Sequence, residues 1–243
     1  MICEDGYGKA KISMVDVAAN YREIVDRISE AASKSGRHPR EVKILAAAKS
    51  QGAELVRTAI TAGVRLVGEN YVQEAESKRQ VISENVEWHM IGHLQRNKVR
   101  TALNTFDFIQ SLDSAGLALE LDKEGRRNGK TVRALIEINL GDEPSKSGIT
   151  RGKVAELLKS VGDLPHVRVE GLMTVPPFKE RPEDVRPFFR ALKELQLELQ
   201  CLAIPNAGLN ELSMGMTHDY PIAVEEGATI VRIGTALFGP RKA

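Results

Sequence analysis

The stretch KILAAAKS, residues 43–50, is a short apolar run that closes with a lysine. A run of this length fits either a buried strand or a buried helix, so its flanks must decide. The turn-rich residues 36–40 precede it, and a helical pattern over residues 55–60 follows it. We therefore predict a buried strand that ends at Lys49 and leads into a helix.

The predicted strand has two faces, because side chains alternate along a strand. One face carries Lys43, Leu45, Ala47 and Lys49. If this face lines a barrel, the small Ala47 leaves room for a ligand and Lys49 reaches the mouth. The alternative is a lysine at a strand end that extends into water without a function, and a single lysine favours that alternative. The rest of the chain must decide between them.

Composition excludes several classes of partner. The chain has 243 residues, 28% of them charged, and a net charge of +1. This balance gives no general attraction to nucleic acid or to an anionic membrane, so we expect neither as a partner. No apolar segment approaches the roughly 20 residues that span a bilayer.

The cysteines and the amino terminus indicate a cytoplasmic protein. Cys3 and Cys201 are the only cysteines, and their spacing fits no metal site. The first residues carry Glu4 and Asp5 and lack the apolar core of a signal peptide. We expect residues 1–12 to be flexible.

Eight strand patterns alternate with helical patterns along the chain. The strands are predicted at residues 43–49, 66–70, 86–91, 106–110, 132–139, 167–173, 209–213 and 228–233. Helices are predicted at 15–35, directly after 49, at 71–81, from 92, and at 114–127, 150–161, 184–202 and 217–226. This order predicts a single α/β domain over residues 1–243, a (β/α)8 TIM barrel with an extra N-terminal helix. An open doubly wound sheet is the main competitor, but it requires an early glycine-rich turn that the chain lacks.

Polar residues gather where the predicted strands end, which is where barrel active sites lie. They are Lys49, Asn70, His93, Ser111, Asp113, Asn139, Thr174, Ser213, Arg232, Gly234 and Thr235. A Gly-Thr pair before a short helical turn offers a phosphate cradle at Gly234 and Thr235, and Ser213 with Met214 supplies a hydroxyl and backbone beside it. An ordinary strand-to-helix turn explains Gly234 equally well. Arg232 is expected to point into the mouth, or else to form an outer salt bridge.

An amine at the first strand and a phosphate cradle at the last two fit a ligand with an aldehyde at one end and a phosphate at the other. Pyridoxal 5′-phosphate (PLP) has this form, and a lysine Schiff base is its usual tether. An aldolase that forms a Schiff base with a sugar phosphate is an alternative.

Seven segments carry a resemblance to a known family. They are residues 47–49, 68–74, 88–98, 146–148, 171–174, 212–216 and 231–239. In these segments the chain resembles the pyridoxal phosphate homeostasis protein family, which is related to the barrel domain of bacterial alanine racemases. The resemblance implies that Lys49 forms the internal aldimine and that Asn70 lies beside the ring. It also implies that Ser213, Gly234 and Thr235 hold the phosphate and that Arg232 faces the pyridine nitrogen.

The resemblance implies a protein of intracellular PLP homeostasis with little or no turnover, handing cofactor to PLP-dependent apoenzymes, as a monomer or weak dimer. A cationic Arg232 would disfavour protonation of the ring, which argues against aminotransferase chemistry. The alternative is an amino-acid racemase that uses Lys49.

Racemisation needs a second acid or base, which alanine racemases take from a C-terminal domain. The chain ends at Ala243, and neither Tyr71 nor Tyr220 lies in such a motif, so we expect racemase activity to be absent or vestigial. His93 is interpreted either as an acid or base or as a residue that caps a helix. Lys146 is interpreted either as a second lysine that binds the cofactor or as a loop residue exposed to water. Trp88 and the neighbouring His89 are expected to be structural.

Overall fold

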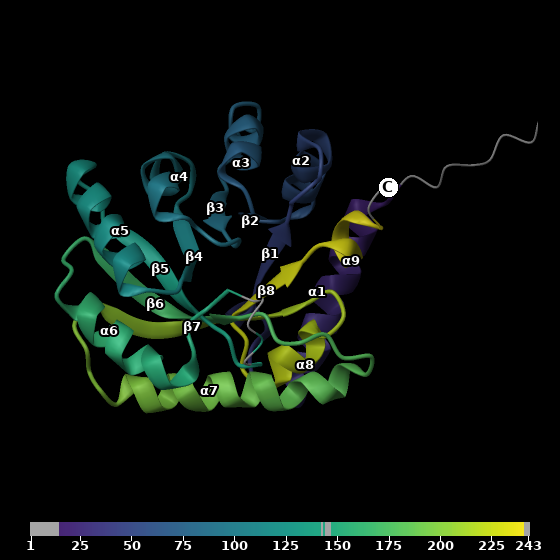
Figure 1. Cartoon of the computed structure of the whole chain (residues 1–243). Coiled ribbons are helices and arrows are strands. Elements are labelled where there is room, and N and C mark those ends of the chain that lie inside the picture. The colour runs from purple at the N-terminus through teal and green to yellow at the C-terminus, as the bar shows by residue number, and fades with distance from the viewer. Residues whose placement is uncertain (1–14, 142, 144–146, 241–243) are drawn as a thin grey trace, which may run out of the picture.

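The computed structural model describes residues 15–141, 143 and 147–240, and its strands close into a parallel barrel (Figure 1). The strands are β1 (Lys43–Ala47), β2 (Leu66–Glu69), β3 (Glu87–Met90), β4 (Phe108–Leu112), β5 (Val132–Ile138), β6 (Val167–Thr174), β7 (Ala207–Met216) and β8 (Ile230–Ile233). Each strand pairs in parallel with the next, and β8 pairs with β1. The predicted (β/α)8 fold is confirmed.

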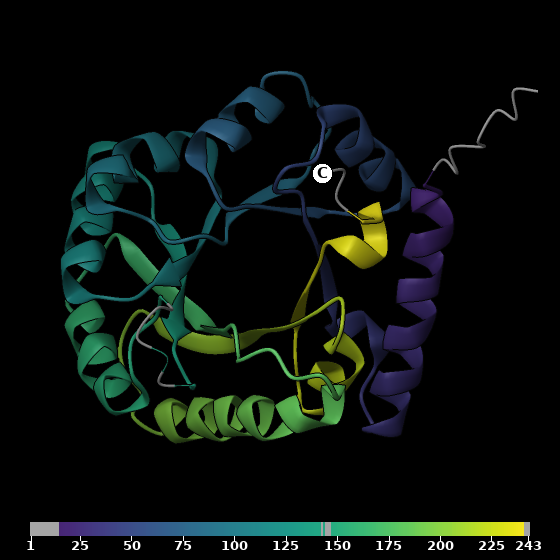
Figure 2. The same cartoon turned by 45° about the vertical axis from the view of Figure 1, so that its right-hand side comes forward.

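Helices surround the barrel as a ring (Figure 2). They are α1 (Val17–Lys34), α2 (Ala53–Ala62), α3 (Val72–Arg79), α4 (Val99–Thr105), α5 (Ala115–Arg127), α6 (Val154–Gly162), α7 (Arg186–Gln200), α8 (Tyr220–Glu225) and α9 (Thr235–Phe238). The predicted N-terminal helix is α1, which begins at the Asp16 cap and packs against α2, α8 and α9. Helix α1 therefore covers the part of the barrel wall that the short helices α8 and α9 do not cover.

The two faces of β1 lie in different layers, as the alternation predicts. Leu45 packs with Leu66 and Ile230 inside the barrel, while Ala46 and Ala48 belong to the main core between strands and helices. A second interior cluster consists of Phe108, Leu135 and Met173. Apolar residues fill only part of the interior, and buried polar side chains occupy the rest. These are His89, Gln110, Glu137, Ser213 and Arg232.

Several predicted boundaries are wrong, and one of them changes the site. Strand β7 continues three residues past Ser213 to Met216, because Gly215 at φ 88° lets the strand bend and its register against β8 shift. Ser213 therefore lies within the strand and not at its end. Strand β1 stops at Ala47, two residues before Lys49.

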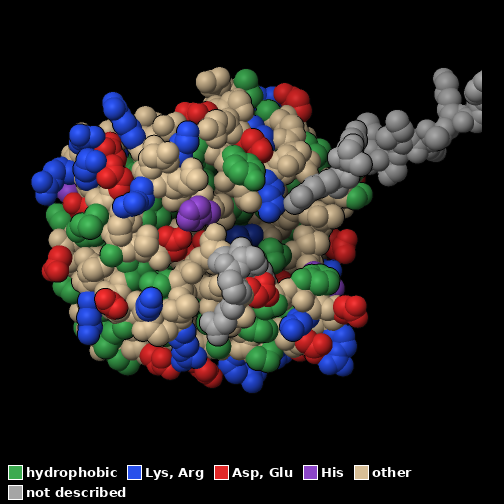
Figure 3. All heavy atoms as spheres, viewed as in Figure 1, with side chains coloured by type: hydrophobic (Ala, Val, Ile, Leu, Met, Phe, Trp, Pro, Cys, Tyr) green, Lys and Arg blue, Asp and Glu red, His purple; other side chains and the backbone are tan. Residues whose placement is uncertain are grey.

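Charged side chains of both signs are interspersed over the face in Figure 3, in line with the balanced composition. Within the part of the chain that the structure describes, no helix has the length and apolarity to cross a membrane. The same residues contain no group of His, Cys, Asp and Glu side chains arranged to hold a metal ion.

Candidate functional site

The site lies at the carboxyl ends of three neighbouring strands, β7, β8 and β1. Lys49 follows β1, Gly234 follows β8, and Thr217 follows β7. The ends of β1 and β8 touch, since a Cβ placed on Gly234 would lie 3.7 Å from the Ala47 carbonyl oxygen. The structure thus brings the predicted Lys49 and Gly234 to one edge of the barrel.

The loop that carries Lys49 is anchored on both sides of the lysine. The Ala48 N–H donates to the Gly68 carbonyl at 2.8 Å, and the Ala48 carbonyl accepts from Lys78 Nζ at 2.8 Å. The Ser50 N–H donates to Glu74 Oε2 at 3.0 Å, with Ser50 in the left-handed region at φ 63°. These bonds fix the backbone on which the half-buried Lys49 stands.

A buried ion pair supports this anchor. Lys78 on α3 bonds to Glu69 at the end of β2, and their side chains are only 9% and 0% exposed. Burial raises the pKa of Glu69, and the bond from Lys78 opposes that shift. Sequence reasoning missed Lys78 and Glu74, because a lysine and a glutamate on a predicted helix give no sign that they face the neighbouring loop.

A hydroxyl at the end of β7 reaches the start of α9. The Ala236 N–H donates to Thr217 Oγ1 at 3.1 Å, which joins the loop after β7 to the turn after β8. Asp219 Oδ1 accepts from the Met216 N–H at 2.7 Å and fixes that loop. Thr217 is half-buried and Thr235 is exposed. Thr217 was not predicted, although a hydroxyl just after the segment 212–216 was the available signal.

Arg232 points into the barrel, so the alternative of an outer salt bridge is wrong. Its guanidinium donates to Ser213 Oγ at 2.6 Å and to the Thr174 carbonyl at 2.7 Å, and the residue is 4% exposed. Burial lowers the pKa of Arg232 to about 10, while the charges of Glu137 and Asp219 act in the opposite direction. Arg232 forms no ion pair within residues 15–240 as described.

The side chains of Ser213 and Met214 are both fully buried. The Ser213 hydroxyl is fully buried and donates to Gln110 Oε1 at 2.6 Å. The Met214 side chain is also fully buried and belongs to the core beneath the helices. Both positions follow from the extension of β7 to Met216, which moves the end of the strand past them.

Glu137 on β5 is a buried carboxylic acid that sequence reasoning did not single out. It is 7% exposed, and its Oε2 atom is buried without a hydrogen-bond partner among the described residues. Burial raises its pKa to about 7; Arg232 lowers it and Asp113 raises it further. The interior beneath the mouth therefore holds both a cation and a carboxyl group that titrates near neutrality.

The other predicted residues take varied positions. Asn70 is half-buried after β2, where Gly92 approaches it so closely that a Cβ would lie 2.5 Å from the Asn70 carbonyl. His93 caps no helix, because α4 begins only at Val99; its Nδ1 lies 3.3 Å from Asp113 Oδ2, so the capping prediction is wrong. Trp88 is buried in the core as predicted, whereas Lys146 lies outside the described residues.

The two tyrosines weighed for racemisation differ in exposure. Tyr71 is 62% exposed at the start of α3, and Tyr220 is 1% exposed in the core, beneath the Arg27 guanidinium. Because its side chain is buried in the core, Tyr220 is not placed to act as an acid or base on a ligand at the barrel mouth.

The class of the protein follows from the barrel and its relatives. The family model "Alanine racemase, N-terminal domain" matches residues 13–242. An alanine racemase from Clostridium difficile has the same fold with a TM-score of 0.69 at 13% identity, and the alignment covers 93% of this chain and 58% of the racemase.

Relatives with higher sequence identity identify the family within this class. The pyridoxal phosphate homeostasis protein of Aquifex aeolicus is 45% identical over 90% of this chain and 96% of its own length. That of Escherichia coli K12 is 38% identical over 94% and 98%. The structure of PipY from Synechococcus elongatus PCC7942, solved with PLP bound, aligns with a TM-score of 0.77 at 36% identity, over 87% of this chain and all of PipY. The chain belongs to the pyridoxal phosphate homeostasis protein family.

Proposed function

We propose that this protein binds PLP and acts in PLP homeostasis, with the cofactor attached to Lys49. The observation that carries the proposal is the meeting of an anchored lysine after β1 with the Thr217 and Gly234 turns after β7 and β8. An amine after β1 and a Gly-Thr turn after the adjacent strand β8 suit a ligand that has an aldehyde and a phosphate on one ring. The PLP bound to the related PipY supports the same assignment.

The residues at the mouth fit such a ligand. Thr217 would bind the phosphate together with the backbone of Gly234 and Thr235, beside which the absent Gly234 side chain leaves space. The buried Arg232, which has donors but no ion pair within the described part of the chain, would face the ring nitrogen. Asn70 would lie beside the ring. PLP supplies an aldehyde that condenses with a primary amine and releases one water.

In this proposal Ser213 takes a different part from the one predicted from the sequence, whereas Met214 keeps its predicted backbone role. Ser213 would act through Arg232, because its hydroxyl accepts from that guanidinium and lies inside the barrel. Met214 would contribute only its backbone, since its side chain fills the core. Gly215, between Met214 and Met216, has φ 88°, and a Cβ there would lie 2.5 Å from the Ala223 Cβ, so this turn requires glycine.

Little or no turnover is part of the proposal. Arg232 is buried and cationic, so it disfavours a proton on a ring nitrogen that it faces. This weakens the ring as an electron sink. We further propose that the protein works in the cytoplasm, as a monomer or weak dimer, and hands PLP to apoenzymes.

The test compares Lys49, in the loop after β1, with Lys43, the first residue of that strand. Purified wild-type protein is mixed with PLP, reduced with borohydride, and mapped by peptide mass spectrometry. We expect a visible chromophore and a label on Lys49, and the loss of both in Lys49→Ala. Lys43→Ala is the matched control, because Lys43 lies at the other end of β1, and it should keep the label.

Three results would contradict the proposal. A colourless, unlabelled wild-type protein would favour binding of a sugar phosphate. A label on Lys43 would misplace the site. Interconversion of D- and L-alanine or serine that depends on Lys49 would make the protein a racemase.

A further inference from the structure

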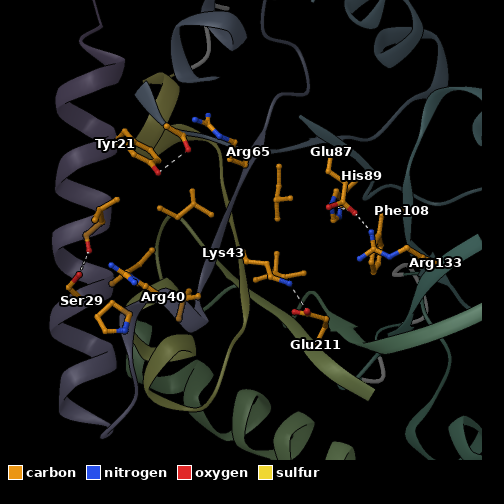
Figure 4. A pocket seen from close by; sticks show the side chains of 18 residues that line it. Tyr21, Ser29, Arg40, Lys43, Arg65, Glu87, His89, Phe108, Arg133 and Glu211 are labelled. Carbon is orange, nitrogen blue, oxygen red and sulfur yellow. Dashed lines mark hydrogen bonds and ion pairs between the residues drawn. The ribbon is translucent and has the colours of Figure 1, made fainter. Parts of the chain in front are cut away.

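A cavity of about 500 Å³ opens at the amino ends of the strands, the end of the barrel away from Lys49 (Figure 4). We call it the basal cavity. It lies between α1 and the first residues of β1 to β5, β7 and β8. Its apolar wall includes Val25, Ile28, Ile44, Leu66 and Phe108. A cavity of this volume with apolar walls has the size of a small-molecule site.

Cationic side chains outnumber carboxylates around the basal cavity. Arg40, Lys43, Arg65 and Arg133 line it, against Glu87 and Glu211. Lys43 pairs with Glu211 at 2.5 Å, and Arg133 forms two bonds of 2.8 and 2.9 Å with Glu170 outside the cavity.

The charge of the cavity depends on Glu87 and Arg40. Arg133 Nη1 lies 2.5 Å from Glu87 Oε1 and lowers the pKa of Glu87, so this carboxylate stays ionised. The Arg40 guanidinium forms no ion pair with any residue that the structure describes. The cavity therefore carries an excess of positive charge that suits a monoanion.

His89 is a buried polar side chain in the wall of the basal cavity. It is 1% exposed, its ring stacks on Phe108 with centroids 4.7 Å apart, and burial lowers its pKa. Its Nδ1 lies 2.8 Å from Gln110 Nε2, which donates to it because Gln110 Oε1 already accepts from Ser213. The neutral ring therefore carries its proton on Nε2.

The Nε2–H of His89 has no hydrogen-bond partner in the described part of the chain. Glu87 Oε1 lies 3.6 Å from it, which is too far for a hydrogen bond. A buried donor without an acceptor is costly and rare in native proteins. A ligand oxygen in the basal cavity would satisfy it.

The same histidine ends a chain of buried hydrogen bonds that crosses the barrel. Arg232 donates to Ser213 at 2.6 Å, Ser213 donates to Gln110 at 2.6 Å, and Gln110 donates to His89. We call these four residues the axial relay. All four are at most 4% exposed, so no water competes for these bonds from outside. The donors all point toward the basal cavity, which leaves His89 Nε2 as the end of the relay.

We propose that the basal cavity is a second ligand site, which binds a small carboxylate with an apolar body and receives it on His89 Nε2–H. The apolar wall would take the body, and Arg40 at the rim would attract the charge. The axial relay would connect this ligand to Arg232. The binding itself does not depend on the proposed PLP function, whereas the connection to Arg232 rests on it.

The experiment measures binding of 3-phenylpropanoate to the full chain by titration calorimetry, without added PLP. The neutral control ligand is 3-phenylpropan-1-ol, which has the same body without the charge. We expect saturable binding of the acid with a dissociation constant of about 1 mM or lower, and at least about tenfold weaker binding of the alcohol.

Three variants locate the ligand. Arg40→Glu reverses the charge at the rim and should weaken binding about tenfold. Arg168→Glu is its matched control, because Arg168 is 61% exposed on β6 near the same end but does not line the cavity, and it should leave binding unchanged. His89→Asn keeps an acceptor for Gln110 and removes the Nε2 donor, so it should weaken binding at least about tenfold while the circular dichroism spectrum is retained.

Several outcomes would overturn the proposal. These are no binding of the acid at about 5 mM, equal binding of acid and alcohol, or equal loss in Arg40→Glu and Arg168→Glu. Preferential binding of inorganic phosphate would identify a simple anion site and contradict the carboxylate class. If His89→Asn unfolds, a nitrogen NMR shift of His89 Nε2 in wild-type protein on adding the acid is expected, and its absence overturns the role of that donor.

Discussion

The two ends of the barrel contain similar residues in opposite environments. Each end holds a lysine, Lys43 at the start of β1 or Lys49 in the loop after it, and a Lys–Glu ion pair. At the carboxyl end, Lys78 and Glu69 are buried and hold the loop of Lys49. At the amino end, Lys43 is 48% exposed and Glu211 is 17% exposed. A charge pair therefore fixes backbone where it is buried, and it can exchange partners for a ligand where water reaches it.

The carboxyl groups at the two ends differ in the same way. Glu137, beneath the mouth, forms no ion pair with a residue that the structure describes, and burial raises its pKa to about 7. Glu87, at the basal cavity, has Arg133 beside it and a pKa of about 2. The first can therefore exchange a proton near neutral pH, whereas the second is a fixed anion. Four predictions address this contrast between the ends, beginning with the largest expected effect.

Removal of the buried lysine should destabilise the protein most. Lys78→Met leaves Glu69 buried without a partner, so the free energy of unfolding should fall by about 3–5 kcal/mol in urea denaturation. Lys43→Met is the matched change at the amino end and should cost less than about 1 kcal/mol. The double variant Lys78→Met/Glu69→Gln should recover part of the loss. Equal losses in the free energy of unfolding for Lys78→Met and Lys43→Met would contradict the proposed difference between the two ends.

The two glutamates should give stability profiles of opposite sign with pH. The pKa of Glu137 is higher in the folded protein than the ordinary 4.5, so its ionisation opposes folding. Wild type should lose stability relative to Glu137→Gln as pH rises from 4.5 to 7, by up to about 3 kcal/mol.

Glu87 supplies the opposite case. Its pKa is lower in the folded protein, so its contribution is present above pH 4.5 and is lost as pH falls toward 2. The free energy of unfolding of Glu87→Gln should therefore be lower than that of wild type at neutral pH, and the difference should shrink as the pH falls. Denaturation of the three proteins from pH 3 to 8 checks both signs, and parallel profiles would contradict the raised pKa of Glu137.

Loss of the Thr217 hydroxyl should weaken PLP binding moderately. Thr217→Val removes a side-chain oxygen where we place the phosphate and leaves the Ala236 N–H without its acceptor. We expect about tenfold weaker binding, measured by the absorbance of bound cofactor. Thr217→Ser keeps the hydroxyl and should stay close to wild type. If Thr217→Val binds PLP with unchanged affinity, the phosphate is not bound at this turn.

The smallest expected effect is the coupling of the two ends. Saturating 3-phenylpropanoate should tighten PLP binding about fivefold, because it orders the axial relay that holds Arg232. Gln110→Met interrupts the relay and should reduce this factor to less than about twofold. Unchanged coupling in that variant would show that the relay does not connect the ends. Absence of PLP binding altogether would refute the proposed function and leave the basal ligand test standing.

Local patterns in the sequence were sufficient for the fold. The apolar run at 43–50 with breakers on one side and helical spacing on the other predicts a strand, and eight such units predict a barrel. The same patterns place Lys49, Asn70 and Gly234 beyond strand ends. They do not fix where β7 ends, because a glycine at φ 88° and a register shift decide it, and both depend on neighbouring strands.

The sequence by itself determined the alternation of strands and helices and the lysine after the first strand, since these depend on spacing and on turn residues along the chain. Only the tertiary structure decided which polar groups lose contact with water. The barrel buries Glu69 with Lys78, leaves Glu137 Oε2 buried without a hydrogen bond to any described residue, and joins Arg232 to His89 through Ser213 and Gln110. The bonded residues of the relay are 19, 103 and 21 positions apart in the chain. Their charges and protons are set by burial and by partners that only the closed barrel supplies.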